Sequence, residues 1–387
     1  MSEPTAVPLD KAQIVYFKNL DVLRFLAAFM IVVAHTYEGW KGWFGFPSFM
    51  CDNNSNAPSL FGRLLEQFIM NLGVGVDVFF LISGFLITYL LIKEKEETGT
   101  IHLINFYIRR TLRIWPIYFL IIAITPFLIK LTQSPQPDYL SNILFIGNFS
   151  MIKSGVWSFP FAHFWSICIE EHFYLIWPFI VLYFPTRKLP VIFFFVVFLS
   201  VIYRGYISLV PSENQWMQLY LNSLCRFDVL AIGALFGYIH YFNPIKFKPI
   251  IGIRFMLYIL FFLIMCLDPI VLYDNIFLAT FKKYFYSMFF VFSMGNYLFN
   301  SEALLNFKKK NFVHYLGKVS YGIYMFHNII IPLVIQFIIL RYQLNNFYVY
   351  TILTYAISVV LPIFVFELFE KQILKLKVRF EIIRTQR

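Results

Sequence analysis

Charged side chains are scarce in this sequence. They make up 14% of the 387 residues, whereas hydrophobic residues make up 59% and the mean hydropathy is +0.69. Water-soluble globular proteins carry about a quarter charged residues, so this composition excludes a soluble globule of this length. It predicts an all-α, polytopic transmembrane helical bundle.

Cysteine is also rare, and no functional pattern is built on it. Cys168, Cys225 and Cys266 lie in apolar segments and Cys51 lies in a loop. Neither a disulfide framework nor a paired-thiol metal motif can be read from this spacing. The sequence also lacks a His-Glu-x-x-His motif, so we expect no metal site.

Acidic residues are outnumbered by Lys and Arg, 21 against 32, which gives a formal net charge of +11. The basic residues lie between hydrophobic runs, where membrane topology explains them, and we therefore expect no nucleic-acid partner. A short apolar core with a cleavage signature is missing after the polar leader 1–19. The first helix is thus expected to be retained.

About ten apolar runs are long enough to span a membrane. An even number of spans puts both termini on one side, and most Lys and Arg fall on that side, which indicates the cytoplasm. We assign 20–371 to the membrane domain and 372–387 to a cytoplasmic basic tail. The expected spans are 20–38, 71–92, 107–128, 163–184, 190–209, 221–242, 250–267, 275–299, 320–340 and 348–369.

The first apolar run carries two ionisable residues on one face, Arg24 and His35. A helix advances about 100° and 1.5 Å per residue, so these residues are nearly three turns and about 16 Å apart. Ionisable groups at membrane depth are costly unless they face the protein interior or water. The pair predicts a polar channel with His35 as general base. The alternative is a histidine that hydrogen-bonds a neighbouring carbonyl.

The segment 105–116, NFYIRRTLRIWP, forms a cluster of basic residues. Arg109 and Arg113 are four residues apart and share a helix face, with Arg110 beside them. Three guanidinium groups suit the phosphates of a nucleotide-like donor. Ordinary anchoring of a helix at the cytoplasmic surface is the alternative.

The segment 163–178, HFWSICIEEHFYLIWP, places two adjacent carboxylates in an apolar run. Glu170 precedes Tyr174 by four residues, a spacing that allows a hydrogen bond. We consider Glu170 the acid that orients or charge-stabilises His35. The alternative is a structural ion pair with Arg24 or Arg226.

Cys168 and His172 are also four residues apart. This spacing permits a thiol nucleophile with its base, but a buried cysteine usually acts as a small apolar filler. Further polar residues lie in the glycine-rich segment 73–88, in 225–237 and in 316–328. Ser83 is a candidate for the donor site, and the candidates for contact with the substrate or the oxyanion are Asp228, Ser320, Tyr321, Tyr324 and His327.

In their order and spacing, these motifs resemble acyltransferase family 3, the integral-membrane O-acyltransferases that modify bacterial surface glycans. The similarity covers 20–371 and includes VDVFFLISGFLIT, FYIRRTLRIWPIY, FWSICIEEHFYLIWP, RFDVLAIGALFG and SYGIYMFH. The resemblance implies that Arg24 and His35 are the functionally required pair. It also implies that Arg110 and Arg113 belong to the donor site.

Two positions depart from the family pattern. His172 stands where glutamine is usual, and the terminal Glu-basic-Pro pattern reads Glu370, Lys371, Gln372. Glu367, three residues earlier, is therefore considered as the inward-facing acid. Many family members carry an extra extracytoplasmic esterase-like domain, and we expect none in this chain.

The resemblance implies transfer of an acyl group, usually acetyl, from cytoplasmic acyl-CoA to a sugar hydroxyl. The acceptor would be an envelope polysaccharide or its lipid-linked precursor at the bacterial cytoplasmic membrane. We expect direct transfer, with Arg109, Arg110, Arg113 and Ser83 at the acyl-CoA and Ser320, Tyr321 and Tyr324 near the oxyanion. The competing functions are a transporter or flippase of polysaccharide precursors and a structural partner in polysaccharide assembly.

Overall fold

The computed structural model describes residues 17, 19–52, 57–210, 212–245, 248–267, 276–300, 302, 303 and 311–383. All regular elements within these ranges are helices, and each of the ten predicted spans coincides with one of the long ones. These are α1 (Leu20–Phe44), α3 (Gly75–Thr98), α4 (Leu103–Thr132), α7 (Phe164–Tyr183), α8 (Leu189–Leu209), α10 (Phe227–Phe242), α11 (Ile251–Leu267), α12 (Ile276–Phe299), α13 (Phe312–Val334) and α14 (Phe347–Val365).

Five shorter α-helices lie between or after the long ones along the described chain. Their bounds are α2 (Leu60–Asn71), α5 (Tyr139–Ile143), α6 (Gly147–Ser154), α9 (Gln215–Leu221) and α15 (Lys371–Leu376). After α14 the chain passes through a π-helical segment, Phe366–Glu370, directly into α15. A helix thus continues where the sequence suggested an end, because Gln372 keeps the backbone N–H that proline lacks.

Seven helical segments in the described ranges are long and apolar enough to cross a membrane. They are Leu20–Phe44, Leu60–Thr98, Leu103–Thr132, Phe164–Tyr183, Thr186–Leu209, Phe312–Leu340 and Phe347–Phe380. α10 and α11 are apolar but shorter, and α12 is not among the seven. The chain is therefore an all-helical, multi-pass membrane protein, whereas the count of ten spans and the cytoplasmic position of both ends stay predictions.

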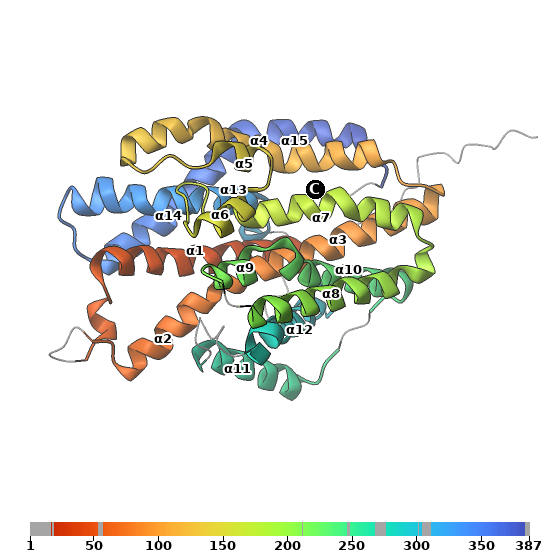
Figure 1. Cartoon of the computed structure of the whole chain (residues 1–387), viewed down its shortest axis with the longest axis horizontal. Coiled ribbons are helices and arrows are strands. Elements are labelled where there is room, and N and C mark those ends of the chain that lie inside the picture. The colour runs from red at the N-terminus through yellow and green to blue at the C-terminus, as the bar shows by residue number, and fades with distance from the viewer. Residues whose placement is uncertain are drawn as a thin grey trace, which may run out of the picture.

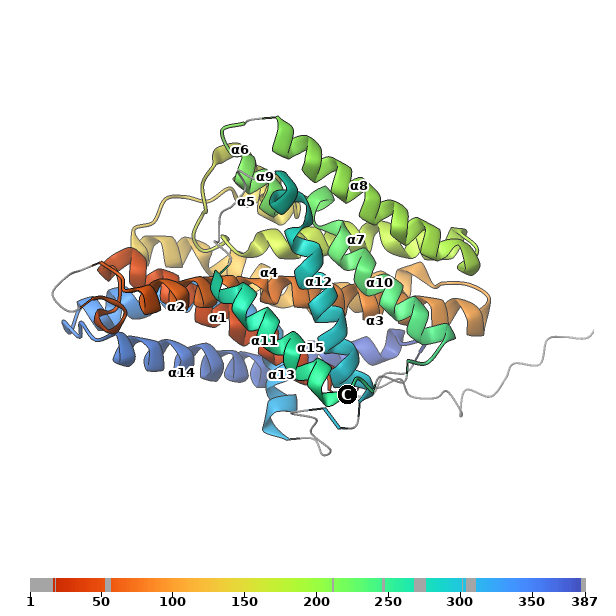
Figure 2. The ribbon, with the colours of Figure 1, turned by 90° about the horizontal axis from the view of Figure 1, so that it is seen from below.

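The long helices run lengthwise through the molecule, and their connections gather at two opposite ends (Figure 1). The α3–α4 and α7–α8 connections lie at one end, and the α4–α5 and α13–α14 connections lie at the other. This grouping agrees with the division of loops predicted from charge. α11 and α12 cross α1 and α3 obliquely, as the second view makes plain (Figure 2).

Glycines allow the backbones of the central helices to come into direct contact. A Cβ atom on Gly84 of α3 would lie 2.0 Å from the carbonyl oxygen of Leu230 in α10, and one on Gly317 of α13 would lie 2.0 Å from that of Asp21 in α1. A main-chain carbonyl cannot move aside for a methyl group, so close packing requires glycine at both positions. These contacts fix α10 against α3 and α13 against α1.

Candidate functional site

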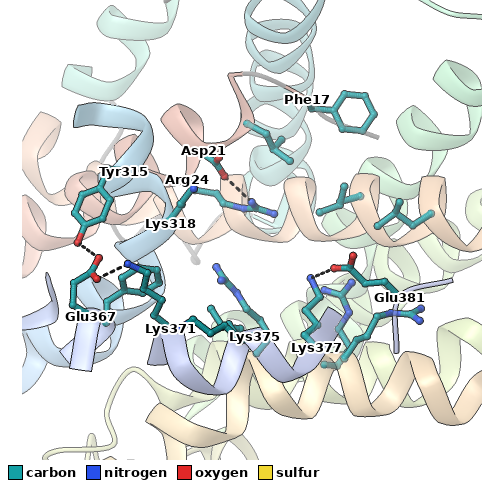
Figure 3. Close-up of a pocket in the computed structure, with 18 residues that line it drawn as sticks. Phe17, Asp21, Arg24, Tyr315, Lys318, Glu367, Lys371, Lys375, Lys377 and Glu381 are labelled. Atoms are coloured by element: carbon teal, nitrogen blue, oxygen red, sulfur yellow. Dashed lines mark hydrogen bonds and ion pairs between the residues drawn. The ribbon is translucent and has the colours of Figure 1, made fainter. Parts of the chain in front are cut away.

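A strongly basic cavity of about 460 Å³ lies near the α3–α4 connection, since Leu86 and Leu90 of α3 and Arg109 of α4 line it. Helices α1, α4 and α13 line it together with the chain that follows α14 (Figure 3). Its acidic lining residues are Asp21, Glu367 and Glu381. The basic lining residues are Arg24, Arg109, Arg110, Arg113, Lys318, Lys371, Lys375 and Lys377. This excess of positive charge suits a ligand with several anionic groups.

Arg109 is held mainly by the protein itself. One of its Nη atoms donates to the Phe380 carbonyl at 2.6 Å, and the other lies 3.4 Å from a carboxylate oxygen of Glu94. Glu94 is buried and also accepts a hydrogen bond from the backbone N–H of His102 at 2.7 Å. Arg109 therefore ties α4 to α3 and to the C-terminal segment.

The other cavity arginines differ in the interactions that they make with protein groups. Arg24 lies 3.1 Å from Asp21 one turn earlier, and Arg113 lies 3.8 Å from Glu370. Arg110 instead stacks over the Tyr174 ring at 5.8 Å, and its buried Nε has no hydrogen-bond partner among the described residues. Arg110 thus lines the cavity without a carboxylate partner at ion-pair distance among the described residues.

Glu370 is the deeply buried acid at the end of α14. Glu370 is 1% exposed, and both of its carboxylate oxygens lack a hydrogen-bond partner among the described residues. The Glu367 side chain is 38% exposed, pairs with Lys371 and lines the basic cavity. Glu367 therefore faces the cavity, whereas Glu370 faces the interior of the bundle.

Glu170 lies close to Ser83, Tyr174 and the cavity arginines Arg24 and Arg110. The hydroxyls of Ser83 and Tyr174 form a short hydrogen bond with each other. Glu170 and Tyr174 are therefore neighbours, as their spacing predicted, while a hydrogen bond between them stays a prediction.

His35 lies in a cluster of three histidines. Its Nδ1 is 2.8 Å from Nε2 of His327, and the two rings stack with 5.0 Å between their centroids. The His163 ring lies 5.3 Å from that of His327, and neither of its nitrogens has a hydrogen-bond partner within the described part of the chain. The partner of His35 is thus His327 rather than the hypothesised Glu170, which belongs to the arginine site.

The histidine cluster lies apart from the basic cavity. His35 is not among the residues that line the cavity, and α1 separates it from Arg24 by about 16 Å. Tyr321 lies within electrostatic range of Arg113, Glu170 and Glu171. One carboxylate oxygen of Glu171 is buried without a partner in the described ranges.

The three hydroxyls considered for oxyanion binding are already engaged. Ser320 donates to the Gly317 carbonyl at 2.8 Å, and Tyr321 donates to the Ile114 carbonyl at 2.8 Å. Tyr324 donates to the His163 carbonyl at 3.0 Å and also bonds Ser166. Each would have to break a hydrogen bond before it could stabilise an oxyanion.

Comparison with known proteins gives the family of the chain. The family model for the acyltransferase 3 domain, described as "Acyltransferase domain", matches residues 17–367. The chain belongs to the acyltransferase 3 family. No solved structure matches it significantly.

Two curated relatives carry informative names. The peptidoglycan O-acetyltransferase OatA of Listeria monocytogenes is 25% identical over 352 residues, which cover 82% of this chain and 50% of the relative. The O-acetyltransferase OatA of Staphylococcus aureus strain NCTC 8325 is 27% identical over 347 residues, covering 82% and 51%. This acyltransferase 3 chain spans about half the length of the curated relatives it matches.

Asp228 does not join the site in this acyltransferase 3 chain. Its carboxylate lies 2.7 Å from Arg204 of α8, and neighbouring Arg226 lies 2.6 Å from Asp77 of α3. All four residues are buried. The interpretation of Asp228 as a substrate residue is therefore corrected to a helix-packing ion pair, since its partner on another helix cannot be read from local sequence.

Cys168 and His172 do not form the nucleophile and base that their spacing permitted. Cys168 is fully buried, and Nδ1 of His172 lies 2.8 Å from the Ser223 hydroxyl. Among the described residues, no group of three His, Cys, Asp or Glu side chains is arranged to hold a metal ion.

Several site residues of this acyltransferase 3 chain were missed by the sequence reasoning. The basic tail was assigned to membrane topology, although some of its residues line the cavity. Lys318 lies three residues before Tyr321 in the segment 316–328 that supplied other candidates, and this position could have identified it. His163 is the first residue of the segment 163–178. The missed residues are His163, Glu171, Lys318, Lys371, Lys375 and Lys377.

Proposed function

We propose that this chain is an O-acetyltransferase that moves an acetyl group from acetyl-CoA to a sugar hydroxyl of an envelope polysaccharide or lipid-linked glycan. One observation carries the proposal. The eight-cation cavity lies at one end of the α1–α13 pair, and the same two helices carry His35 and His327 further along. A phosphate-bearing donor and a proton acceptor thus meet on one pair of helices.

The donor site is the basic cavity. CoA carries three phosphate groups, and arginine forks bind phosphate oxygens in pairs. Arg110 lines this cavity and offers its guanidinium for such a contact, while Leu86 and Leu90 line the cavity with apolar surface for the pantetheine arm. The arm then follows Ser83, Glu170 and Tyr321 toward His35.

Transfer is direct. His35 accepts the proton of the sugar hydroxyl as the oxygen attacks the thioester carbonyl, and the C–S bond breaks as the ester forms. The imidazolium then gives the proton to the CoA thiolate. The side chain of His35 is half-buried and Glu38, one turn further, is exposed, so the acceptor approaches from the end opposite the cavity.

The names of the relatives support a glycan acceptor, because one is described as a peptidoglycan O-acetyltransferase. The membership in an acyltransferase family supports acyl transfer over transport of a polysaccharide precursor. A transporter would need neither thioester turnover nor a histidine at this position.

The test is mass spectrometry of the surface glycan from a strain that lacks the gene and carries a plasmid copy. We expect the wild type and His172→Gln to restore O-acetylation and His35→Ala to restore none. His172→Gln is the matched control, since it removes a buried-segment histidine outside the cluster. Equal O-acetylation in all three strains would contradict the proposal.

A further inference from the structure

The hydrogen bonds around His327 assign its tautomer. Nδ1 of His327 contacts the main-chain carbonyl oxygen of Tyr324, and a carbonyl can only accept, so this nitrogen carries the hydrogen. In a neutral ring, Nε2 then has a lone pair and accepts. The atom 2.8 Å from Nε2 is Nδ1 of His35, which must therefore be the donor.

The reverse arrangement is unfavourable. If Nε2 of His327 donated to His35, either Nδ1 would face the carbonyl with a lone pair or the ring would carry a positive charge. His327 is 0% exposed, and an ionised group in such a place is costly without a paired anion. The neighbouring ring of His163 offers no negative charge.

We propose that His327 is a positioning residue that holds His35 in the tautomer protonated at Nδ1. The lone pair of His35 then lies on Nε2, where it takes the proton of the acceptor hydroxyl. His327 thus has the orienting role that was predicted from the sequence for Glu170. This inference rests on the proposed function, because it names how the same base is oriented.

The packing of α1 against α13 supports this role. Gly317 brings the two backbones together near one end of the pair, and a Cβ on Gly39 would lie 2.6 Å from the Ile331 side chain near the other. The imidazole pair lies between these two close approaches. The packing of the two backbones therefore holds the two rings in a fixed position relative to each other, and the contact does not depend on the choice of side-chain rotamer alone.

During transfer the bond between the two rings persists. The hydroxyl proton moves to Nε2 of His35, and Nδ1–H continues to donate to Nε2 of His327 while His35 is positively charged. The proton on Nε2 then passes to the CoA thiolate, which restores the starting tautomer. No proton leaves His327 at any point.

Two variants separate positioning from packing. In His327→Gln the amide oxygen can occupy the place of Nε2 and accept from His35, whereas His327→Leu fills the space without an acceptor. We measure CoA release from acetyl-CoA by the full chain in lipid nanodiscs, with surface glycan extracted from the host as acceptor. We expect His327→Gln to keep kcat within about threefold and His327→Leu to lose at least about tenfold, both with unchanged KM for acetyl-CoA.

Nitrogen-15 NMR of histidine-labelled wild-type protein tests the tautomer without any activity, with the His35 signals assigned by their loss in His35→Gln. We expect the proton on Nδ1 of His35, and its redistribution toward Nε2 in His327→Leu. A proton on Nε2 in the wild type overturns the inference, as does a His327→Leu enzyme with full kcat. Full activity of His35→Ala would instead overturn the proposed function while leaving the tautomer result intact.

Discussion

Arg110 lines the cavity and contacts the Tyr174 ring, but no carboxylate lies at ion-pair distance from it among the described residues. Arg110→Gln removes the charge and keeps a polar, shorter side chain. We expect the KM for acetyl-CoA to rise about tenfold, because a hydrogen bond to a charged group contributes about 1.5–3 kcal/mol and about 1.4 kcal/mol is a factor of ten. Steady-state kinetics check this.

The control for Arg110→Gln is Arg187→Gln, which changes an exposed arginine in the α7–α8 connection, at the same end of the molecule. Its KM should equal that of the wild type. An equal rise in both variants would mean that general surface charge, and not the cavity, attracts the donor.

The ion pair between Asp77 and Arg226 makes a prediction on stability. Asp77→Ala leaves a guanidinium that is 1% exposed without its carboxylate. Breaking a buried pair in this way costs about 3–5 kcal/mol. We expect a clearly lower unfolding temperature for the detergent-solubilised variant.

The double variant Asp77→Ala with Arg226→Met restores part of this loss, since the stranded charge is gone and an apolar chain takes its place. If the single and double variants unfold at the same temperature, charge burial is not the cause. Fluorescence-detected size exclusion after heating measures all three proteins.

At the scale of secondary-structure elements, the contact between α3 and α10 depends on how closely their two backbones approach each other. Gly84→Ala would place a Cβ 2.0 Å from the Leu230 carbonyl, and such overpacking costs typically about 1–3 kcal/mol. Gly205→Ala in α8 is the matched control because nothing lies within 4 Å of its Cβ. It should keep or raise stability, by up to about 1 kcal/mol.

Equal thermal stability of Gly84→Ala and Gly205→Ala would contradict this account of the helix pair. The same measurement distinguishes packing from function. If Gly84 instead left room for a ligand arm, Gly84→Ala would raise the KM for acetyl-CoA and leave the unfolding temperature unchanged.

The π-helical segment Phe366–Glu370 is another feature of an element rather than of a residue. It turns Glu370 toward Arg113 and leaves Glu367 at the cavity edge with Lys371. The C-terminal helix then brings Lys375 and Lys377 to the cavity. The basic cavity is thus completed by a segment that composition alone assigns to a tail.

For the whole molecule, sidedness is the property to test. Charge places the α7–α8 connection inside and α6 outside, and the structure puts them at opposite ends. We expect a membrane-impermeant maleimide to label Lys153→Cys in intact cells and Arg187→Cys only after permeabilisation. The background replaces Cys51 and Cys266 with Ala, because these are the cysteines that are not buried.

Reversed labelling would move the basic cavity to the outer face and remove its access to cytoplasmic acetyl-CoA. Labelling of both positions in intact cells would indicate leaky membranes, which a cytoplasmic marker protein detects. The result bears on the whole chain, since one orientation fixes every connection between the spans.

The amino-acid sequence by itself determined the helices and their order. Apolar length and periodicity are local properties, so every predicted run became a helix. The face shared by Arg24 and His35, the grouping of Arg109, Arg110 and Arg113 and the family membership also follow from spacing along the chain.

Only the tertiary structure decided which polar groups meet. His35 pairs with a residue 292 positions away, and Asp228 pairs with Arg204 from another helix. Such contacts depend on the rotation and depth of each helix relative to its neighbours. Close packing at glycines and the π-helical segment determine this rotation and depth. Spacing within one helix carries no information about either, because both arise from surfaces that are far apart in the chain.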